Sequence, residues 1–213
     1  PLLERGDLDL HVVELDTESA DFLVTEELLP SERVHGVDLL SWNPDMAFPN
    51  NKPFIVAGNF PYNISSQILF QVIDWRERVP ELVGMFQKEV AQRIAEGPGS
   101  RTYGILSVLL QTYYDIEYLF TVDEDAFDPP PRVKSGVIRL LRNDMIDPGC
   151  SFLHLKRVVK GAFNQRRKTL RNALSSAGFA EEMIPKEFLK KRAEQLSPKE
   201  FHILAIALIP TSS

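Results

Sequence analysis

The chain has 213 residues, of which 44% are hydrophobic and 25% are charged, so we expect one substantial core, or one domain with a smaller appendage, and no extended disorder. Its longest apolar runs, such as Ile203 to Ile209, are far shorter than the roughly 20 residues of a membrane-spanning helix, so no membrane partner is expected. A lone Cys150 excludes an internal disulfide, and no basic-then-apolar leader opens the sequence, which favours the cytoplasm.

Charge is distributed unevenly along the chain, although the total is only -6. Residues 1 to 128 hold 8 Lys and Arg against 23 Asp and Glu, whereas residues 129 to 180 hold 11 against 2. A basic segment of this kind predicts a contact with phosphate; the alternative is a solvated basic face that balances the acidic part of the same molecule. The predicted phosphate-binding residues are Arg132, Lys156, Arg157, Lys160, Arg166, Arg167, Lys168 and Arg171.

Short apolar runs alternate with helical patterns through the first two thirds of the chain, which favours an α/β sheet. The last two runs follow each other without a helix between them, so we expect an antiparallel hairpin that closes an otherwise parallel sheet. Pro129, Pro130 and Pro131 predict an ordered, extended connection between these two runs. The predicted strands cover Leu10 to Val13, Arg33 to Val37, Phe54 to Ala57, Leu82 to Phe86, Glu117 to Val122 and Gly136 to Leu141.

After Arg142 the strand pattern stops and only helices are predicted. We therefore expect a sheet domain over residues 1–143 and a small all-helical domain over residues 144–213, with the boundary near residues 143–150. The last helix has the best-marked start, because Ser197, Pro198 and Glu200 form a capping pattern. The predicted helices cover Thr17 to Leu29, Ser65 to Trp75, Tyr103 to Tyr114, Phe152 to Phe163, Gln165 to Ala177 and Pro198 to Leu208.

The start of the chain is typical of a helix end over Pro1 to Arg5, stopped by Gly6 and followed at once by a strand. A doubly wound sheet normally begins one strand and one glycine-rich turn earlier. No closely spaced glycines precede Leu10. We therefore expect the sheet to be incomplete at its N-terminal side, without its first strand and glycine-rich loop.

Polar residues at the carboxyl ends of the predicted strands are the candidate ligand-binding residues, because ligands of open α/β sheets lie there. Glu14 has the position of an acidic residue that accepts hydrogen bonds from two ribose hydroxyls, whereas the nearby Asp16 is suited to cap the next helix. Asp38 ends the second strand, and it is suited either to accept an adenine amino group or to cap a turn.

The most specific pattern is Asn59-Phe60-Pro61-Tyr62, directly after a predicted buried strand. An adenine amino nitrogen is a poor nucleophile because its lone pair is delocalised into the ring. The Asn59 side-chain carbonyl and the Phe60 main-chain carbonyl are each suited to accept one amino hydrogen, which directs the lone pair at an electrophilic methyl. Pro61 makes the turn rigid, and Tyr62 offers a face for an unpaired base. The alternative is an ordinary Asn-x-Pro turn with a packed tyrosine.

Phe127 offers a second face for the same base, positioned by the proline loop that follows it. The alternative for an isolated aromatic residue is a place in the core. No metal site is expected, and no general base is evident among these residues.

Four stretches together make the chain resemble the ribosomal RNA adenine dimethyltransferases, closest to the bacterial KsgA type that modifies small-subunit (16S) ribosomal RNA. The resemblance runs nearly end to end, and its motifs are highly specific. They are Val12-Val13-Glu14-Leu15-Asp16, Gly58-Asn59-Phe60-Pro61-Tyr62-Asn63-Ile64-Ser65-Ser66, residues 127–135, and Phe163-Asn164-Gln165-Arg166-Arg167-Lys168-Thr169-Leu170.

This resemblance implies a Rossmann-like class I methyltransferase domain that uses S-adenosyl-L-methionine, followed by a helical RNA-contacting domain. Glu14 and Asn59 are then cofactor-binding residues, with Asp38 at the cofactor adenine. Tyr62 and Phe127 sandwich the target adenine, and Asn59 to Tyr62 form the catalytic motif. The implied partner is small-subunit ribosomal RNA or a pre-assembled small subunit, in ribosome biogenesis, with the enzyme acting as a monomer.

The sequence departs from the family pattern at two places. Phe60 stands where the family most often has Leu, which is harmless if only its carbonyl acts. The expected glycine-rich loop has no counterpart, so we expect weak or no activity from this chain. Three alternatives stay open: a large-subunit dimethyltransferase of the macrolide-resistance type, a DNA adenine methyltransferase, and a noncatalytic RNA-binding or assembly factor.

Overall fold

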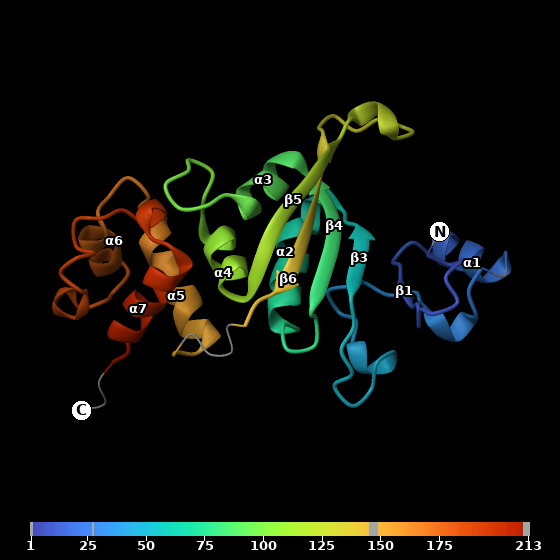
Figure 1. Cartoon of the computed structure of the whole chain (residues 1–213), viewed down its shortest axis with the longest axis horizontal. Helices are drawn as coiled ribbons and strands as arrows, with labels where there is room; N and C mark the ends of the chain where they lie inside the picture. Colours follow the sequence, from blue (N-terminus) through green and yellow to red (C-terminus); the bar gives the residue numbers. More distant parts are fainter. Residues whose placement is uncertain (1, 27, 145–148, 211–213) are drawn as a thin grey trace.

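The computed structural model describes residues 2–26, 28–144 and 149–210 and arranges them in three parts along the long axis of the molecule (Figure 1). At the N-terminal end, strands β1 (Val12–Val13) and β2 (Val34–His35) pair in parallel beside helix α1 (Thr17–Thr25). A four-stranded sheet forms the middle, and helices form the C-terminal end.

The middle sheet has the strand order β3-β4-β6-β5. Strand β3 (Val56–Asn59) runs parallel to β4 (Glu81–Gln87), whereas β6 (Ser135–Arg142) is antiparallel to both β4 and β5 (Tyr114–Val122). The predicted antiparallel hairpin at the end of the sheet is therefore confirmed.

Helices α2 (Ser65–Asp74), α3 (Lys88–Ala95) and α4 (Ile105–Tyr113) cover one face of this sheet (Figure 1). Helix α2 buries four apolar side chains, which recur at helical spacing. Helix α3 was not predicted, because it is short and starts directly after β4, without a turn between them; its buried residues are Ala91 and Ile94.

The C-terminal part consists of α5 (Phe152–Asn164), α6 (Leu170–Ser176) and α7 (Pro198–Ala207). The predicted cap of α7 is confirmed: Glu200 N–H donates to Ser197 Oγ over 3.2 Å, and Ser197 N–H donates to the Glu200 carboxylate over 2.8 Å. Helix α6 starts later than predicted, because Lys168 N–H bonds Gln165 O over 2.7 Å in a separate turn. Among the described residues, no helix is long and apolar enough to cross a membrane.

One continuous core connects the sheet with the C-terminal helices, since Phe86 and Leu109 belong to the same buried cluster as Leu155 and Phe201. The change from strands to helices lies between Arg142 and Phe152, as the sequence predicts. Residues 145–148 of the predicted boundary lie outside the described residues, so the division into two domains stays a prediction.

Two predictions about the first part of the chain are wrong. Leu2 to Arg5 form a turn, closed by a 3.2 Å bond from Arg5 N–H to Leu2 O, in place of a helix end; Pro1 lies outside the described residues. Strand β3 is not buried: among the described residues it pairs only with β4, and Ile55 just before it is 61% exposed. An apolar run is typical of a central strand. Here Phe54 of the run is apolar because it packs against the rings of Trp42 and Phe48.

Candidate functional site

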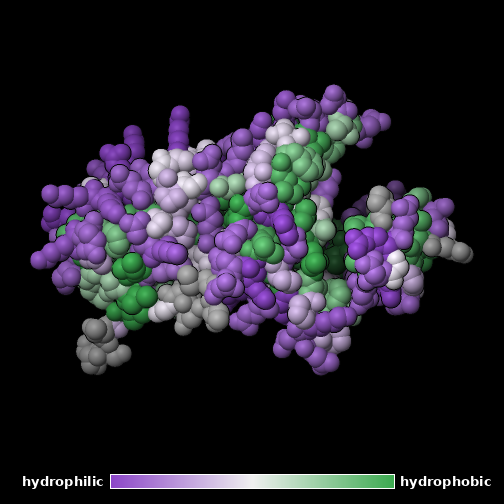
Figure 2. Space-filling model, viewed as in Figure 1, coloured by the Kyte–Doolittle hydropathy of each residue, from purple (hydrophilic) through white to green (hydrophobic). Residues whose placement is uncertain are grey.

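A cavity of about 390 Å³ lies between the β1–β2 pair and strand β3. Figure 2 shows an apolar hollow between these two parts of the molecule. The charged residues that line the cavity are the carboxylates Asp9, Glu14 and Asp38. Because the carboxyl ends of β1, β2 and β3 all meet here, the cavity has the position expected of a ligand site in an open α/β sheet.

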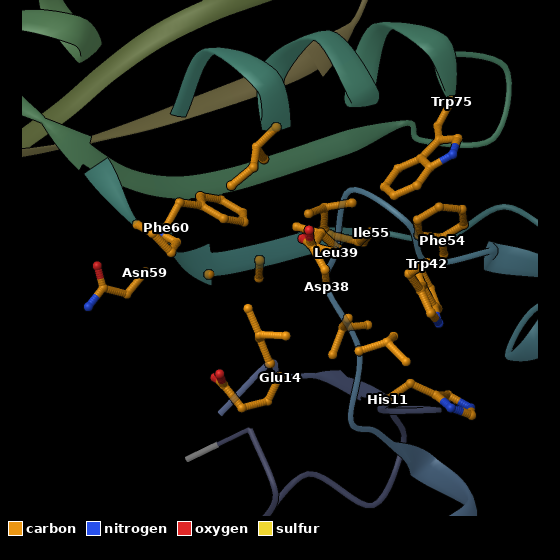
Figure 3. Close-up of a pocket in the computed structure, with 18 of the residues that line it drawn as sticks. His11, Glu14, Asp38, Leu39, Trp42, Phe54, Ile55, Asn59, Phe60 and Trp75 are labelled. Atoms are coloured by element: carbon orange, nitrogen blue, oxygen red, sulfur yellow. The ribbon is translucent and has the colours of Figure 1, made fainter. Parts of the chain in front are cut away.

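Glu14 and Asp38 project into this cavity from the segments that follow β1 and β2 (Figure 3). Glu14 Oε1 accepts the Asp16 N–H over 2.9 Å, and Asp38 Oδ1 accepts the Leu40 N–H over 3.0 Å. No described residue binds the second carboxylate oxygen of either side chain, so each retains an acceptor for a ligand. Asp38 therefore caps a turn, as one of the two predictions had it, and also lines the cavity.

Asp16 has the alternative role predicted for it. Its Oδ2 accepts the Ser19 N–H over 2.8 Å and caps α1, and hydrogen bonding from Ser19 lowers the pKa of the carboxyl. Its side chain therefore belongs to the helix cap.

Aromatic rings close the end of the cavity opposite Asn59 (Figure 3). Trp42 packs edge-on against Phe54 and Trp75, with ring centroids 6.1 and 5.9 Å apart. The Trp42 Nε1–H is buried and has no partner among the described residues. Sequence reasoning did not identify this wall, although Trp42, Phe48 and Phe54 of its rings lie close together in the sequence.

Asn59 ends strand β3 with its side chain exposed and without a hydrogen-bond partner in the described ranges. The next residue, Phe60, is held both by its main chain and by its side chain. The Phe60 N–H donates to Met85 O over 3.1 Å, and the Phe60 ring stacks on Phe86 with centroids 5.0 Å apart. Gly84 makes room for that ring, because a Cβ there would lie 2.6 Å from it. Phe60 is therefore more than a carrier of a carbonyl, since its ring fixes the motif to the sheet.

Tyr62 and Phe127 line one second pocket, of about 340 Å³, together with Asn59, Phe60 and the prolines of the connecting loop. The Tyr62 hydroxyl lies 2.5 Å from Ser135 Oγ at the start of β6. This bond fixes the ring beside the loop that carries Phe127. Residues 59–61 line both the cavity and this pocket, so the two spaces share one wall.

The predicted phosphate-binding residues do not form a single cluster. Lys160 and Arg166 line one groove beside α3, whereas Arg171 pairs with Glu181 over 2.8 Å. Lys156 lies 4.4 Å above the Phe70 ring, and Arg157 lies 4.9 Å above Phe179. Residues 132, 167 and 168 are exposed.

Comparison with known proteins identifies relatives along almost the whole chain. The family model described as ribosomal RNA adenine dimethylase matches residues 2–209. A Porphyromonas gingivalis protein named ribosomal RNA small subunit methyltransferase A is 50% identical over 210 residues, which cover 97% of this chain and 80% of the relative. The protein of the same name from Bacteroides thetaiotaomicron is 50% identical over 202 residues, covering 93% and 74%.

Two solved structures share the fold. A dimethyladenosine transferase from Plasmodium falciparum superimposes with a TM-score of 0.72 at 22% identity, covering 90% of this chain and 78% of that one. The 23S rRNA methyltransferase ErmE superimposes with a TM-score of 0.69 at 20% identity, covering 97% and 84%. These likenesses confirm the predicted Rossmann-like methyltransferase fold with a helical C-terminal part.

Proposed function

The chain belongs to the ribosomal RNA adenine dimethylase family, and we propose that it transfers methyl groups from S-adenosyl-L-methionine to the exocyclic amino groups of adenines in small-subunit ribosomal RNA, giving dimethyladenosine. The observation that carries this proposal is the wall shared by the two cavities. Asn59, Phe60 and Pro61 separate a space with acidic walls from a pocket with two aromatic side chains. Such a wall places a methyl acceptor beside a methyl donor.

The residues of the larger cavity fit the cofactor. Glu14 offers a free carboxylate oxygen to a ribose, Asp38 offers one to an adenine amino group, and the apolar lining suits the ring. S-adenosylmethionine supplies, when bound, an electrophilic methyl on a sulfonium centre. Because that centre is cationic, the carboxylates of Glu14 and Asp38 favour it electrostatically. The third carboxylate of the cavity, Asp9, is already paired with Lys52 over 3.0 Å.

The target adenine is held by groups of the smaller pocket. The Asn59 side-chain carbonyl and the Phe60 main-chain carbonyl each accept one hydrogen of the amino group, so that its lone pair is released from the ring. Tyr62 and Phe127 stack on the two faces of the base, each contact worth about 1–3 kcal/mol. The Phe60–Phe86 stack and the Tyr62–Ser135 bond hold these groups before the base arrives.

The small-subunit branch is favoured over the large-subunit alternative. The relatives at 50% identity are named small-subunit methyltransferases, whereas the likeness to the 23S enzyme at 20% identity concerns the fold alone. We place the protein in the cytoplasm as a monomer that acts in ribosome biogenesis on small-subunit RNA or the assembling particle. The basic C-terminal helices supply its contact with RNA.

The test is transfer of labelled methyl from S-adenosylmethionine to unmethylated small ribosomal subunits by the complete protein, with large-subunit and duplex DNA substrates for comparison. Label recovered as dimethyladenosine in small-subunit RNA is the expected result. Label confined to large-subunit RNA or to DNA would transfer the proposal to the corresponding alternative. No label on any substrate, with RNA binding intact, would favour the noncatalytic assembly factor.

A further inference from the structure

The side chains of His11 and His35 form a hydrogen-bonded pair between the first two strands. His11 directly precedes β1, and His35 is the last residue of β2. The atoms His11 Nδ1 and His35 Nε2 lie 3.1 Å apart, and the two stacked rings have centroids 5.4 Å apart. A hydrogen bond between two imidazole nitrogens needs an N–H on one ring and a lone pair on the other. It is therefore lost when both rings are protonated, because each facing nitrogen then carries a hydrogen.

The carboxylate beside this histidine pair already has other partners. Asp9 Oδ1 lies 3.5 Å from His11 Nε2, and no other described acidic side chain forms an ion pair with either ring. The same carboxylate pairs with Lys52 over 3.0 Å and with Arg33 over 3.7 Å. One carboxylate thus stands against two permanent cations before either imidazole binds an additional proton. Full protonation of the pair adds positive charge to a region that already has an excess of it.

Two aromatic rings pack against the histidine pair. Phe48 lies edge-on to His11 with centroids 5.1 Å apart, and Trp42 lies beside His35 with centroids 5.6 Å apart. Partial burial lowers the pKa of His35 below its ordinary value, and the charge of His11 lowers it further. His35 is therefore neutral in neutral solution, where its ring can accept the bond from His11.

The other charged groups of this region have partners or positions of their own. Arg78 pairs with Asp45 over 2.8 Å. Glu14 and Asp38 project into the cavity, whereas the His11 ring lies toward the aromatic end of the cavity (Figure 3). The protonation of the histidine pair is thus set mainly by its own two rings and by the groups around Asp9.

The main chain of His35 holds both carboxylates of the proposed cofactor site. Its carbonyl oxygen accepts the Glu14 N–H over 3.0 Å and the Val37 N–H over 2.9 Å, and Val37 directly precedes Asp38. Strands β1 and β2 pair over only two residues each. Because so short a ladder is weak by itself, the side-chain bond between the two histidines contributes a large share of the contact between these strands.

We propose that His11 and His35 are positioning residues, which hold Glu14 and Asp38 in place for the cofactor and release them when both imidazole rings are protonated. The additional proton comes from the solvent, and the N–H···N bond is replaced by two N–H groups that face each other. Affinity for the cofactor should therefore fall in mildly acidic solution. The role of the two carboxylates rests on the proposed function, whereas the proton-dependent contact between the strands rests on geometry and charge.

The titration of the histidine pair is measured first, by NMR of the imidazole carbons of the wild-type chain over about pH 5 to 8, where histidine titrates. We expect two separate steps, because two coupled groups bind their protons with apparent pKa values that belong to the pair. The second step should lie below the ordinary histidine value of about 6.5. Two independent titrations near that value would overturn the proposal.

The release of the strands is measured by hydrogen exchange of the Glu14 and Val37 amides, which donate to His35 O. Protection factors are compared, since they correct for the direct effect of pH on exchange. From about pH 7 to 5, wild-type protection should fall about 10-fold, because each unit by which the closed strands lower the pKa of the pair changes the equilibrium tenfold. His35→Gln keeps an acceptor for the His11 N–H and does not titrate, so its protection should fall much less. His154→Gln, in α5, is the control and should behave like the wild type.

Equal loss of protection in the wild type and in His35→Gln overturns the proposal. Calorimetry of S-adenosylmethionine binding to the complete protein tests the positioning role: from about pH 7 to 5 the wild-type affinity should fall about 10-fold, and that of His35→Gln should fall less. The same pH dependence in both proteins would overturn that role, even if protection responds to pH. If protection responds but no S-adenosylmethionine binds at any pH, the proton-dependent release of the strands stands and the proposed function fails.

Discussion

The cavity beside β1 and the groove beside α3 have opposite electrostatics. Three carboxylates and no Lys or Arg line the cavity, whereas four cations and one carboxylate line the groove. The negative charge of the cavity suits the cationic sulfonium of the proposed cofactor, whereas the positive charge of the groove suits an anion. The overall charge of -6 describes neither site.

The largest effect is expected for Asn59→Ala, in the wall shared by the cavity and the target-base pocket. We expect the single-turnover rate of methyl transfer to fall about 100-fold or more, as for loss of a preorganised polar group that acts in the transition state. RNA affinity should change little, because the basic C-terminal helices are untouched. Gln67→Ala, on the exposed side of α2, is the control. Undiminished methylation by Asn59→Ala would remove this residue from the mechanism.

Glu14→Gln tests the acidic cavity beside β1 alone. The carboxylate offers a charge-assisted hydrogen bond, so its loss should weaken S-adenosylmethionine binding about 10- to 100-fold by calorimetry. RNA binding and its salt slope should stay at wild-type values. Asp21→Asn removes the same charge from the exposed surface of α1 and serves as the control. If both variants lose cofactor affinity equally, overall charge rather than a ribose contact explains the effect.

Gly84→Ala tests the packing that holds the shared wall. A Cβ at this position would lie 2.6 Å from the Phe60 ring and 2.7 Å from the Phe86 ring. Overpacking of this kind should lower the free energy of unfolding by about 1–3 kcal/mol, measured by urea denaturation. Gly97→Ala, whose Cβ meets nothing within 4 Å, should leave stability nearly unchanged. Equal stability of the two variants would show that the Phe60 ring is not confined.

The sequence predicted the acidic side and the shared wall better than the groove. Glu14, Asp38 and the residues from Asn59 onward each follow a strand, and strand ends meet at one edge of a sheet, so their convergence can be inferred without coordinates. The groove combines Arg93 and Arg101 with Lys160 and Arg166 from more than 50 positions later in the chain. No periodicity or contiguous charge run links residues so far apart.

Two further differences have local causes. Helix α3 was missed because it has only eight residues and begins directly after strand β4, with no turn residue between the two elements. From the sequence, a Phe at position 60 in place of the more common Leu appeared harmless, because the mechanism uses only the main-chain carbonyl of this residue. In the structure the ring occupies the space above two glycines, Gly58 and Gly84, and stacks on Phe86. Packing partners separated by 24 positions are not visible in a motif.

The smallest expected effect concerns the contact between helix α4, which covers the sheet, and the C-terminal helix α7. His202 of α7 is buried, and its Nε2 lies 3.1 Å from Thr112 Oγ1 of α4. Thr112 Oγ1 donates to Val108 O over 2.9 Å, so it accepts from the His202 N–H. Burial lowers the pKa of His202 below its ordinary value of 6.5.

The sign of the pH dependence follows from this shift. Below pH 6.5 the unfolded chain binds a proton at His202 that the folded chain resists. Stability is therefore lost as the pH falls from about 6.5 through the lower folded-state pKa, and the loss stops below that value. His202→Gln keeps a donor toward Thr112 and removes the titration. As the pH falls from 7.5 to 5, the free energy of unfolding should therefore decrease more for the wild type than for the variant. A difference between the two that is independent of pH would show that His202 is not held neutral in the folded protein.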